Sequence, residues 1–494
     1  MPRLRLVPLC CALTATLAAF TLPVHAQSLV ELYDAARAYD ATYQGARSAY
    51  DASIARAAQA KAGLLPSVGL SANAAYTRQD LRLESVGSTS RDIPQESAGI
   101  NATQPLYRPA NWAAYEQSKR QVDIAQAQLT TAEQDLVVRV SQAFFDVLAS
   151  QDSLALVRAQ KAATEEQLAF AKRNFEVGTT TITDTREAQA RYDLVVAQEI
   201  AAQNDLQVKK IALDQLVGRT NAMPTPLAAP VVLPPLLPAD VNQWVQQAED
   251  GHPSILQARR SLEVATLEVD KARAGHKPTL DAQLGYNVTN NPQGTSTSTS
   301  LQGVRVNAAS IGVVFNMPLF AGFATENRIK ETLALEDQSR SILESTRRSV
   351  TQATRSAYLS LVAGASQVKA LEAAEASSQS ALDANRLGYQ VGVRINIDVL
   401  NSQSQLFQTR RDLAQARYNV LLGNLRLRQA NGTLTEGDLQ PINSTLAAPG
   451  SAGAGASPDL PSAATQSPIQ PQPAQVAPPG GVSPPPPPVR APTR

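Results

Sequence analysis

Cysteine and histidine are almost absent from this sequence, which has two Cys and three His in 494 residues. Both cysteines, Cys10 and Cys11, lie near the start of the chain, so the body has none. A thiol enzyme and a metal centre built from Cys and His are therefore not expected. The body also contains no Gly-x-Ser-x-Gly or Walker A motif. We therefore expect no enzymatic activity and no cofactor.

An excess of one charge and a high aromatic content are lacking as well. The chain has 44 Lys and Arg against 43 Asp and Glu, which leaves a net charge of +1. A protein that binds nucleic acid through a broad basic face would carry an excess of positive charge, so we expect no nucleic-acid partner. Aromatic residues make up only 5%. A body poor in aromatics and rich in Ala, Gln, Leu and Arg favours long helices.

A long apolar run occurs once, at the N-terminus. Arg3 and Arg5 precede an apolar stretch at 9–22, and Val24-His25-Ala26 approximates a cleavage site for a signal peptidase. We interpret residues 1–26 as a signal peptide. Lipidation at Cys11 is the weaker alternative, because the apolar run continues well past it. No other run could form a transmembrane helix, so the exported chain is periplasmic, secreted or inserted in an outer membrane as strands.

The remainder of the sequence repeats itself with an offset of about 212–214 residues. Five landmarks recur in the same order, among them Pro105-Leu106-Tyr107 as Pro318-Leu319-Phe320 and Val177-Gly178 as Val391-Gly392. The division we predict is a first structural repeat at 27–220, a Pro-rich linker at 221–240, a second repeat at 241–436, and a Pro/Ala-rich tail at 437–494. The tail cannot bury enough apolar surface to fold, so we expect it to be disordered.

Both repeats have the same order of expected elements. A helical stretch of about 36 residues (29–64; 241–276) ends at a proline. Two segments with period-two alternation follow, separated by a polar turn at 78–94 in the first repeat and by a Thr/Ser-rich loop in the second. The last expected elements are a helix of about 68 residues, a short turn and a second helix, listed here for the two repeats: 110–177, 178–183 and 184–216; 324–391, 392–397 and 398–430.

The lengths of these helices suggest how they pack. The long helix would extend about 100 Å, and the two shorter helices of a repeat, placed end to end, match it. Such helices favour a coiled coil or a tube of helices. Two hairpins supply four strands, and a membrane barrel needs about eight. Insertion in a membrane would therefore require several copies, and three copies would supply twelve strands. The alternative is a structural periplasmic coiled-coil protein without a pore.

The sequence resembles the TolC-type outer membrane efflux proteins over residues 28–440. The strongest stretch is Gly388 to Leu400, followed by Ala416-Arg417-Tyr418-Asn419 and Asn431-Gly432-Thr433-Leu434. The resemblance implies a mainly α fold with membrane β-hairpins: a homotrimer with a twelve-stranded outer-membrane β-barrel continuous with a long periplasmic α-helical barrel.

The resemblance also implies a function. The expected role is that of an exit duct in a tripartite export system for drugs, secreted polypeptides or both, as in multidrug efflux and type I secretion. Its expected partners are a periplasmic adaptor (membrane fusion) protein, an inner-membrane ABC or RND-type transporter, and the lipid of the outer membrane.

Several residues fall on positions with known roles in this family. Asp398 matches the first acidic position of the ring that closes the periplasmic end; Asn401 replaces the second, which halves the charge of the ring. Asp398 could instead be only a helix N-cap. The polar latch between inner and outer coiled coils matches Thr183, Asp184, Tyr389 and Arg394. Asp184, followed by Glu187, also resembles an N-cap with a capping box.

Two further groups complete the predicted sites. Gly178 and Gly392 end the long helices and are expected to adopt the left-handed conformation; the resemblance adds that these tips contact the adaptor. Aromatic side chains flank the predicted strands, where they favour a membrane interface or, for two of them, packing at the strand–helix junction. They are Tyr76, Tyr107, Trp112, Tyr286, Phe320 and Phe323.

Overall fold

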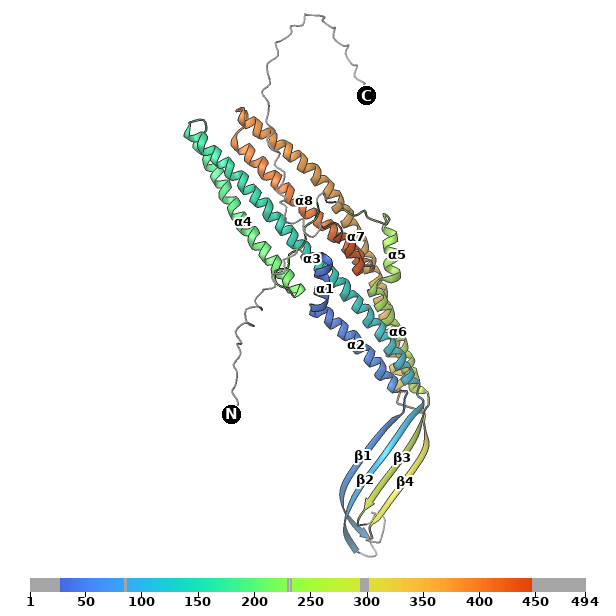
Figure 1. The fold of residues 1–494 in the computed structure, drawn as a ribbon. Coiled ribbons are helices and arrows are strands. Elements are labelled where there is room, and N and C mark those ends of the chain that lie inside the picture. The colour runs from blue at the N-terminus through green and yellow to red at the C-terminus, as the bar shows by residue number, and fades with distance from the viewer. Residues whose placement is uncertain (1–26, 84–86, 229–230, 232, 294–301, 447–494) are drawn as a thin grey trace, which may run out of the picture. The chain divides into compact units, whose positions relative to one another are not determined.

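The computed structural model describes residues 27–83, 87–228, 231, 233–293 and 302–446, and the signal peptide predicted at 1–26 lies outside them. The described part is mainly helical with one small sheet, and its two halves have the same order of elements (Figure 1). The first half contains α1 (Leu29–Tyr39), α2 (Ala41–Ala62), β1 (Ser67–Leu83), β2 (Gly87–Tyr107), α3 (Pro109–Glu176) and α4 (Ile182–Val217). The second half contains α5 (Val241–Gly251), α6 (Pro253–Arg273), the 3₁₀ turn η1 (Ala274–His276), β3 (Thr279–Asn291), β4 (Val304–Asn316), α7 (Ala324–Gln390) and α8 (Asn396–Ala430). A second 3₁₀ turn, η2 (Glu436–Asp438), and α9 (Leu439–Asn443) follow.

The two long helices determine the packing of the others. α3 has 68 residues and α7 has 67, and at 1.5 Å per residue each extends about 100 Å. α3 contacts α2 and α6 along the part near the strands, and α4 and α8 along the other part. α7 contacts α6 and α8 in the same manner. The shorter helices therefore lie one after the other beside the long ones, as their lengths predicted.

The first helical stretch of each repeat is broken, although the sequence pattern predicts one continuous helix there. Asp40 separates α1 from α2, and its carboxylate accepts a hydrogen bond from the Tyr43 amide at 2.7 Å. His252 separates α5 from α6, and its Nδ1 accepts from the Ser254 amide at 3.1 Å. Pro253 reinforces this second break, because a proline disfavours the helical conformation for the residue before it. Asp40 and His252 are thus each the C-cap of one helix and the N-cap of the next.

The sheet has the order β1-β2-β3-β4 and is antiparallel throughout. The turn predicted at 78–94 is wrong, because most of it is strand: β1 continues to Leu83, β2 begins at Gly87, and Gln79 pairs with Arg91. This extension is rich in Arg, Asp, Ser and Thr, a composition that is more typical of a turn than of a half-buried strand. Arg78 and Asp92, which are also paired in register, lie 3.9 Å apart at their charged ends.

The junction between sheet and helices is held by a paired charge. The Arg108 guanidinium, directly before α3, donates from Nε and Nη2 to the two carboxylate oxygens of Asp281 in β3, at 2.8 and 2.6 Å. Asp281 is only 5% exposed. Such two-point contacts fix orientation as well as distance. The start of α3 is therefore tied to a strand of the other repeat.

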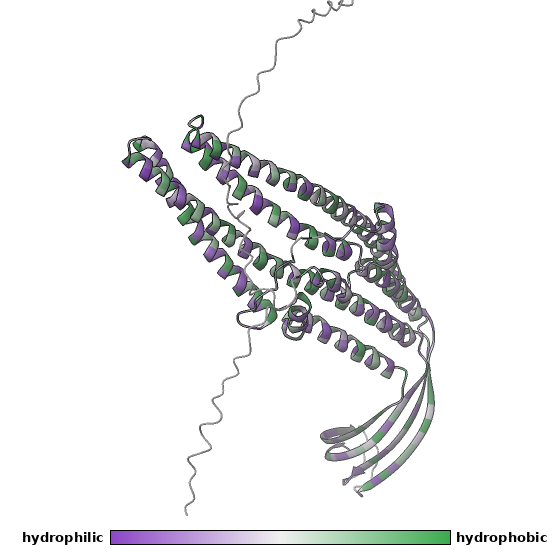
Figure 2. Cartoon of the chain, turned by 45° about the horizontal axis from the view of Figure 1, so that its top comes forward, coloured by the Kyte–Doolittle hydropathy of each residue, from purple (hydrophilic) through white to green (hydrophobic). Residues whose placement is uncertain are grey.

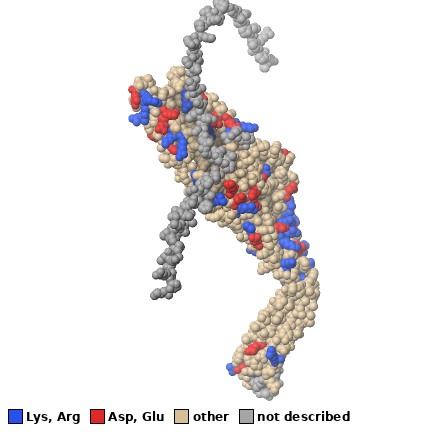
Figure 3. Space-filling view, in the orientation of Figure 1, with Lys and Arg blue, Asp and Glu red and all other residues tan. Residues whose placement is uncertain are grey.

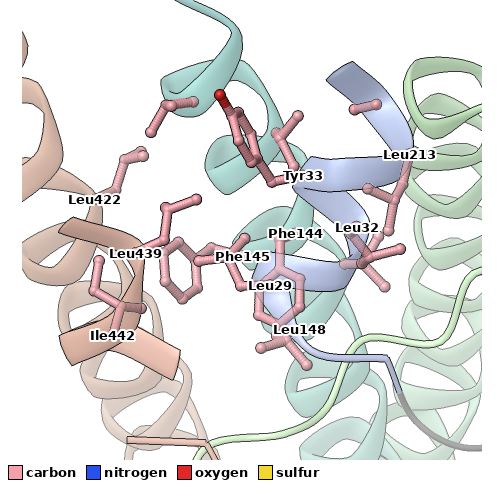
Figure 4. Close-up of a cluster of buried hydrophobic side chains, with 14 of the residues drawn as sticks. Leu29, Leu32, Tyr33, Phe144, Phe145, Leu148, Leu213, Leu422, Leu439 and Ile442 are labelled. Carbon is pink, nitrogen blue, oxygen red and sulfur yellow. The ribbon is translucent and has the colours of Figure 1, made fainter. Parts of the chain in front are cut away.

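The largest hydrophobic core lies around α1, near the middle of the long helices. Figure 4 shows Leu29, Leu32 and Tyr33 of α1 packed against Phe144 and other side chains that α3, α4, α8 and α9 contribute. Phe144 and its neighbour Phe145, both on α3, meet edge to face with ring centroids 5.6 Å apart. Segments from both halves of the chain thus complete a single core.

The ordered part of the chain extends further than predicted. The prediction of disorder from residue 437 is wrong for the first residues of that segment: η2 extends to Asp438, α9 follows it, and Leu439, Ile442 and Leu446 are buried in the core around α1. These three apolar side chains supply the area that the Pro-rich remainder lacks. The rest of the predicted tail, 447–494, lies outside the described residues.

No helix in the described ranges is both long enough and apolar enough to cross a membrane.

The cap at His252 predicts a pH dependence of stability. Burial lowers the pKa of His252, and Nδ1 can accept a hydrogen bond from Ser254 only when it is unprotonated. The cap is therefore complete above the unfolded-state pKa of about 6.5 and is lost as the pH falls through the lower folded-state value. We expect a loss of about 1 kcal/mol of stability at acid pH from this cap.

The measurement is thermal unfolding of the purified protein and of His252→Asn between pH 7.5 and 5. Asparagine caps a helix at any pH in this range, so the variant should lose less stability on acidification than the parent. An equal loss in both proteins would contradict the assignment.

Candidate functional site

The turns that join α3 to α4 and α7 to α8 lie at the ends of the helices opposite the sheet (Figure 1). Gly178 and Gly392 occupy equivalent places in these turns, with φ of +77° and +81°, as predicted. In both, an amide beyond the glycine reaches back to the helix: Thr179 to the Asn174 carbonyl, and Val393 to the Gly388 carbonyl, each at 2.9 Å. Both helices therefore end in a Schellman motif.

Both turns present apolar side chains to solvent. Val177 is 72% exposed, Val391 65% and Val393 76%. A Cβ at Gly178 or Gly392 would meet nothing within 4 Å. Exposed valines beside glycines make a surface that can be approached closely, which is typical of a protein contact rather than of a catalytic pocket.

The start of α4 differs from the prediction. The N-cap is Thr181, not Asp184, and Asp184 is the third residue of the helix, where it completes a capping box with Thr181. Its carboxylate accepts hydrogen bonds from the Thr181 amide and hydroxyl, both at 3.2 Å. The predicted N-cap lies three residues after the observed one, because Thr and Asp are both good N-cap residues. Thr183, the neighbouring latch candidate, is exposed.

The start of α8 bears on the predicted acidic ring. The N-cap is Ile395, without a side-chain cap, so the alternative interpretation of Asp398 as an N-cap is wrong. Asp398 lies in the first turn, and one of its carboxylate oxygens is 3.6 Å from Nη1 of Arg394. Arg394 therefore contacts an acidic residue of its own turn.

Tyr389 is the latch candidate that reaches the other hairpin. Its ring meets that of Phe170 on α3 edge to face, with centroids 5.9 Å apart. Its hydroxyl is buried near Asn174 without a hydrogen bond of normal geometry. Burial raises the pKa of Tyr389, and the Asp184 carboxylate raises it further. The contact between α3 and α7 at this level is thus one of aromatic packing.

Three residues at this site were not predicted from the sequence: Asn396, Gln167 and Arg191. Asn396 is only 1% exposed and bonds to Gln167 of α3 and to the backbone of α4. Arg191 of α4 donates to Oδ1 of Asn401 at 2.7 Å. A polar residue that begins a helix after a turn is usually exposed, so the sequence carries no signal for the burial of Asn396. The predicted ring residue Asn401 is bound by the neighbouring hairpin.

The sheet has two chemically different faces, which follow from its register. Side chains in register across the four strands share a face. One face is apolar and largely exposed, and it includes Val68, Leu70, Ile100, Ala102, Leu284, Tyr286, Ile311 and Val313. The opposite face is polar and mostly uncharged, and it includes Ser71, Asn73, Asn101, Thr103, Gln283, Asn287 and Ser310.

The figures illustrate this separation. Apolar and polar residues alternate along the strands in Figure 2. In Figure 3 the middle of the sheet carries almost no charged atoms, whereas the helices carry many. An uncharged exposed band with one apolar face is the pattern of a strand segment that lies in lipid.

The six aromatic candidates divide into two groups. Tyr107 and Trp112, at the end of β2 and the start of α3, are 46% and 57% exposed. Phe320 and Phe323, before α7, meet edge to face at 5.4 Å and are also exposed. These four lie at the junctions of strands with helices, whereas Tyr76 and Tyr286 lie within β1 and β3.

Comparisons with known proteins agree with these features. The profile of the family described as Outer membrane efflux protein matches residues 32–219 and 244–433, one match in each repeat. Outer membrane protein TolC of Vibrio cholerae is 33% identical over 442 residues, which cover 90% of this chain and 98% of that protein. The alkaline protease secretion protein AprF of Pseudomonas aeruginosa is 29% identical, over 84% of this chain and 87% of that one.

Among solved structures, the fold is similar to that of the outer membrane protein VceC of Vibrio cholerae. The TM-score is 0.69 and the identity 20%, and the match covers 82% of this chain and 96% of that chain.

The left-handed glycine at the second tip predicts a local loss of stability on substitution. Gly392→Ala places a Cβ on a residue with positive φ, which costs about 1 kcal/mol. Gly45→Ala is the control: Gly45 lies inside α2 with no atom within 4 Å of a new Cβ, and alanine there should stabilise by about 0.5–1 kcal/mol. Denaturant unfolding in detergent measures both. Opposite signs are expected, and a neutral Gly392→Ala would show that this turn does not need its conformation.

Proposed function

Because the chain belongs to the outer membrane efflux protein family, it is an outer-membrane exit channel and a transport protein rather than an enzyme, and we propose that three copies of it form the duct. Each copy would contribute its four strands to a twelve-stranded barrel and its long helices to an α-helical barrel in the periplasm. The observation that carries this proposal is the four-stranded sheet with one apolar and one polar face. The apolar face would contact lipid, and the polar face would line the pore.

Closure by other copies follows from the edges of this sheet. β1 and β4 each pair with one neighbour only. In a bilayer the free backbone groups of an edge strand would have no water to bond, so spanning sheets are closed barrels. Four strands are too few to close, since about eight is the minimum. Three copies rather than two is what the family resemblance implies.

The helices offer further support for assembly. Large apolar side chains are exposed on helices that would lie at the boundary between copies. Among those that are more than half exposed are Ile200 and Ile211 on α4, and Ile342 and Leu359 on α7. A contact with neighbouring copies would bury them. The alternative, a periplasmic coiled coil without a pore, would also bury these helices, but it leaves the apolar face of the sheet unexplained.

Channels of this type work with adaptor proteins and inner-membrane transporters in tripartite systems. For this chain we assign the adaptor contact to the two helix tips around Gly178 and Gly392, because they combine exposed valines with backbone that a partner can approach. The transporter would be of the ABC or RND type. One relative is named for alkaline protease secretion and the matching family for efflux, so we propose that both polypeptides and small molecules pass.

The gate would be formed at the start of α8. Three copies of Asp398 around the axis would make a ring of carboxylates, which attracts cations and repels anions. Asn401 adds no charge to it, and Arg394 at 3.6 Å partly offsets each carboxylate. Tyr389, Arg394, Asp184 and Thr183 would hold the closed arrangement, with Tyr389 acting through its ring.

The ring predicts the ion selectivity of the channel. Asp398→Ala should reduce the preference for cations severalfold in planar bilayers containing the purified full chain, because the fixed negative charge at the constriction is removed. The control is Asp383→Ala, which removes a carboxylate of α7 that accepts a hydrogen bond from Gln379 of the same helix and should leave selectivity unchanged. A variant without Asp398 that remains as cation-selective as its parent would place the filter elsewhere.

The aromatic contact predicts which part of Tyr389 matters. Tyr389→Ala removes the ring that meets Phe170, so the single-channel conductance should rise at least twofold. Tyr389→Phe keeps the ring and removes a hydroxyl that makes no hydrogen bond of normal geometry, so its conductance should equal that of the parent. A rise with Tyr389→Phe as large as with Tyr389→Ala would instead assign the latch to the hydroxyl.

A further inference from the structure

We infer that the buried amide of Asn396 is an uncharged pin that holds the α7/α8 hairpin against the α3/α4 hairpin in the closed channel. This inference rests on the proposed gate at the start of α8. It differs from the predicted latch, which depends on the side chains of Thr183, Asp184, Tyr389 and Arg394, because the pin is a buried amide that contacts Asp184 only through its backbone.

The pin joins three helices at one point. Asn396 is the first residue of α8. Its Oδ1 accepts a hydrogen bond from Nε2 of Gln167 on α3. Its Nδ2 donates to the backbone carbonyl of Asp184 on α4, at 3.4 Å. One side chain of the second hairpin is therefore bonded to both helices of the first.

The surroundings of this amide make its bonds hard to replace. Leu400 of α8 packs against Leu168, Ala171 and Ala188 of α3 and α4, and all four are buried. The two alanines let the helices approach closely. An amide enclosed in this way has no water to bond if its partners move away. The hairpins can therefore separate only if water enters the whole contact, which favours two discrete arrangements over gradual opening.

A second contact lies five residues further along α8, where Arg191 of α4 donates to Oδ1 of Asn401 at 2.7 Å. It joins the same two hairpins but is exposed, so water competes for both partners. We therefore assign the main restraint to Asn396 and a weaker one to the Arg191–Asn401 pair.

The charged groups near the pin are bonded within their own turns. Asp184 accepts from Thr181 in its capping box, and Asp398 is paired with Arg394. None of the hydrogen bonds of Asn396 involves a charged side chain. The pin should therefore be insensitive to salt and to pH, and opening should depend on mechanical separation of the tips by a partner.

The test is single-channel conductance of the purified full chain in planar bilayers. Asn396→Leu keeps a similar volume and removes both hydrogen bonds, so conductance should rise at least twofold while the oligomer stays intact. The matched control is Asn385→Leu, which removes a bond to Ser402 within the α7/α8 hairpin and should leave conductance unchanged. An intact Asn396→Leu oligomer with the conductance of its parent would overturn the pin.

A second variant separates a pin from a merely structural residue. In Asn396→Asp the carboxylate can still accept from Gln167, but it can donate to the Asp184 carbonyl only when protonated. Its conductance, relative to the parent at each pH, should be high at pH 8 and fall toward the parent value as the pH is lowered. A ratio that does not change with pH would contradict the inference.

The two proposals fail in different ways. If the parent forms no pore at all in the bilayer, the proposed duct is at fault. If the parent forms a pore and Tyr389→Ala widens it while Asn396→Leu does not, the duct stands and the pin alone is rejected.

Discussion

The structure depends on a constraint that lipid places on the backbone: an amide or carbonyl inside a bilayer must find its hydrogen-bond partner in protein. A four-stranded sheet with two edges cannot meet this constraint alone. If other copies complete the sheet, as we propose, they are available to cover the helices too. A helix of 68 residues with exposed apolar side chains would then be stabilised by contact with its neighbours.

At the other end of the molecule, the proposed gate would be held closed by a balance between charged and neutral contacts. The Arg394–Asp398 pair has side chains that are 58% and 34% exposed, and such pairs contribute about 0–1 kcal/mol. Leaving a buried amide without partners costs about 1–3 kcal/mol. The Asn396 bonds therefore outweigh the visible ion pair, and aromatic packing of Tyr389 on Phe170 adds to them. The proposed gate would therefore depend little on ionic conditions in the periplasm.

Much of this fold could be predicted from local rules. The long helices were found because no proline or glycine interrupts 110–177, and the strands because Leu70 and its neighbours alternate with polar residues. Where local patterns compete, the prediction was wrong: Thr181 and Asp184 can each cap a helix, and the polar extension of β1 and β2 resembles a turn. Tertiary burial was beyond the sequence. Leu439 and Ile442 lie at the edge of a Pro-rich region and yet complete a core, and Asn396 is polar and yet enclosed.

The position of α1 and α9 bears on the order of events during folding. The core around α1 brings Leu29 into contact with Leu439 and Ile442. Two isolated β-bridges, Gln27–Pro224 and Leu227–Leu446, join the start of the described chain to its middle and its middle to its end. In addition, β2 pairs with β3 across the two repeats. Contacts this distant in sequence form late, because the intervening chain must first be brought together. An exported chain cannot complete this core until residue 446 has crossed the inner membrane. Assembly must therefore follow translocation rather than accompany it, and an unfinished chain would leave the apolar side chains of this core exposed to water.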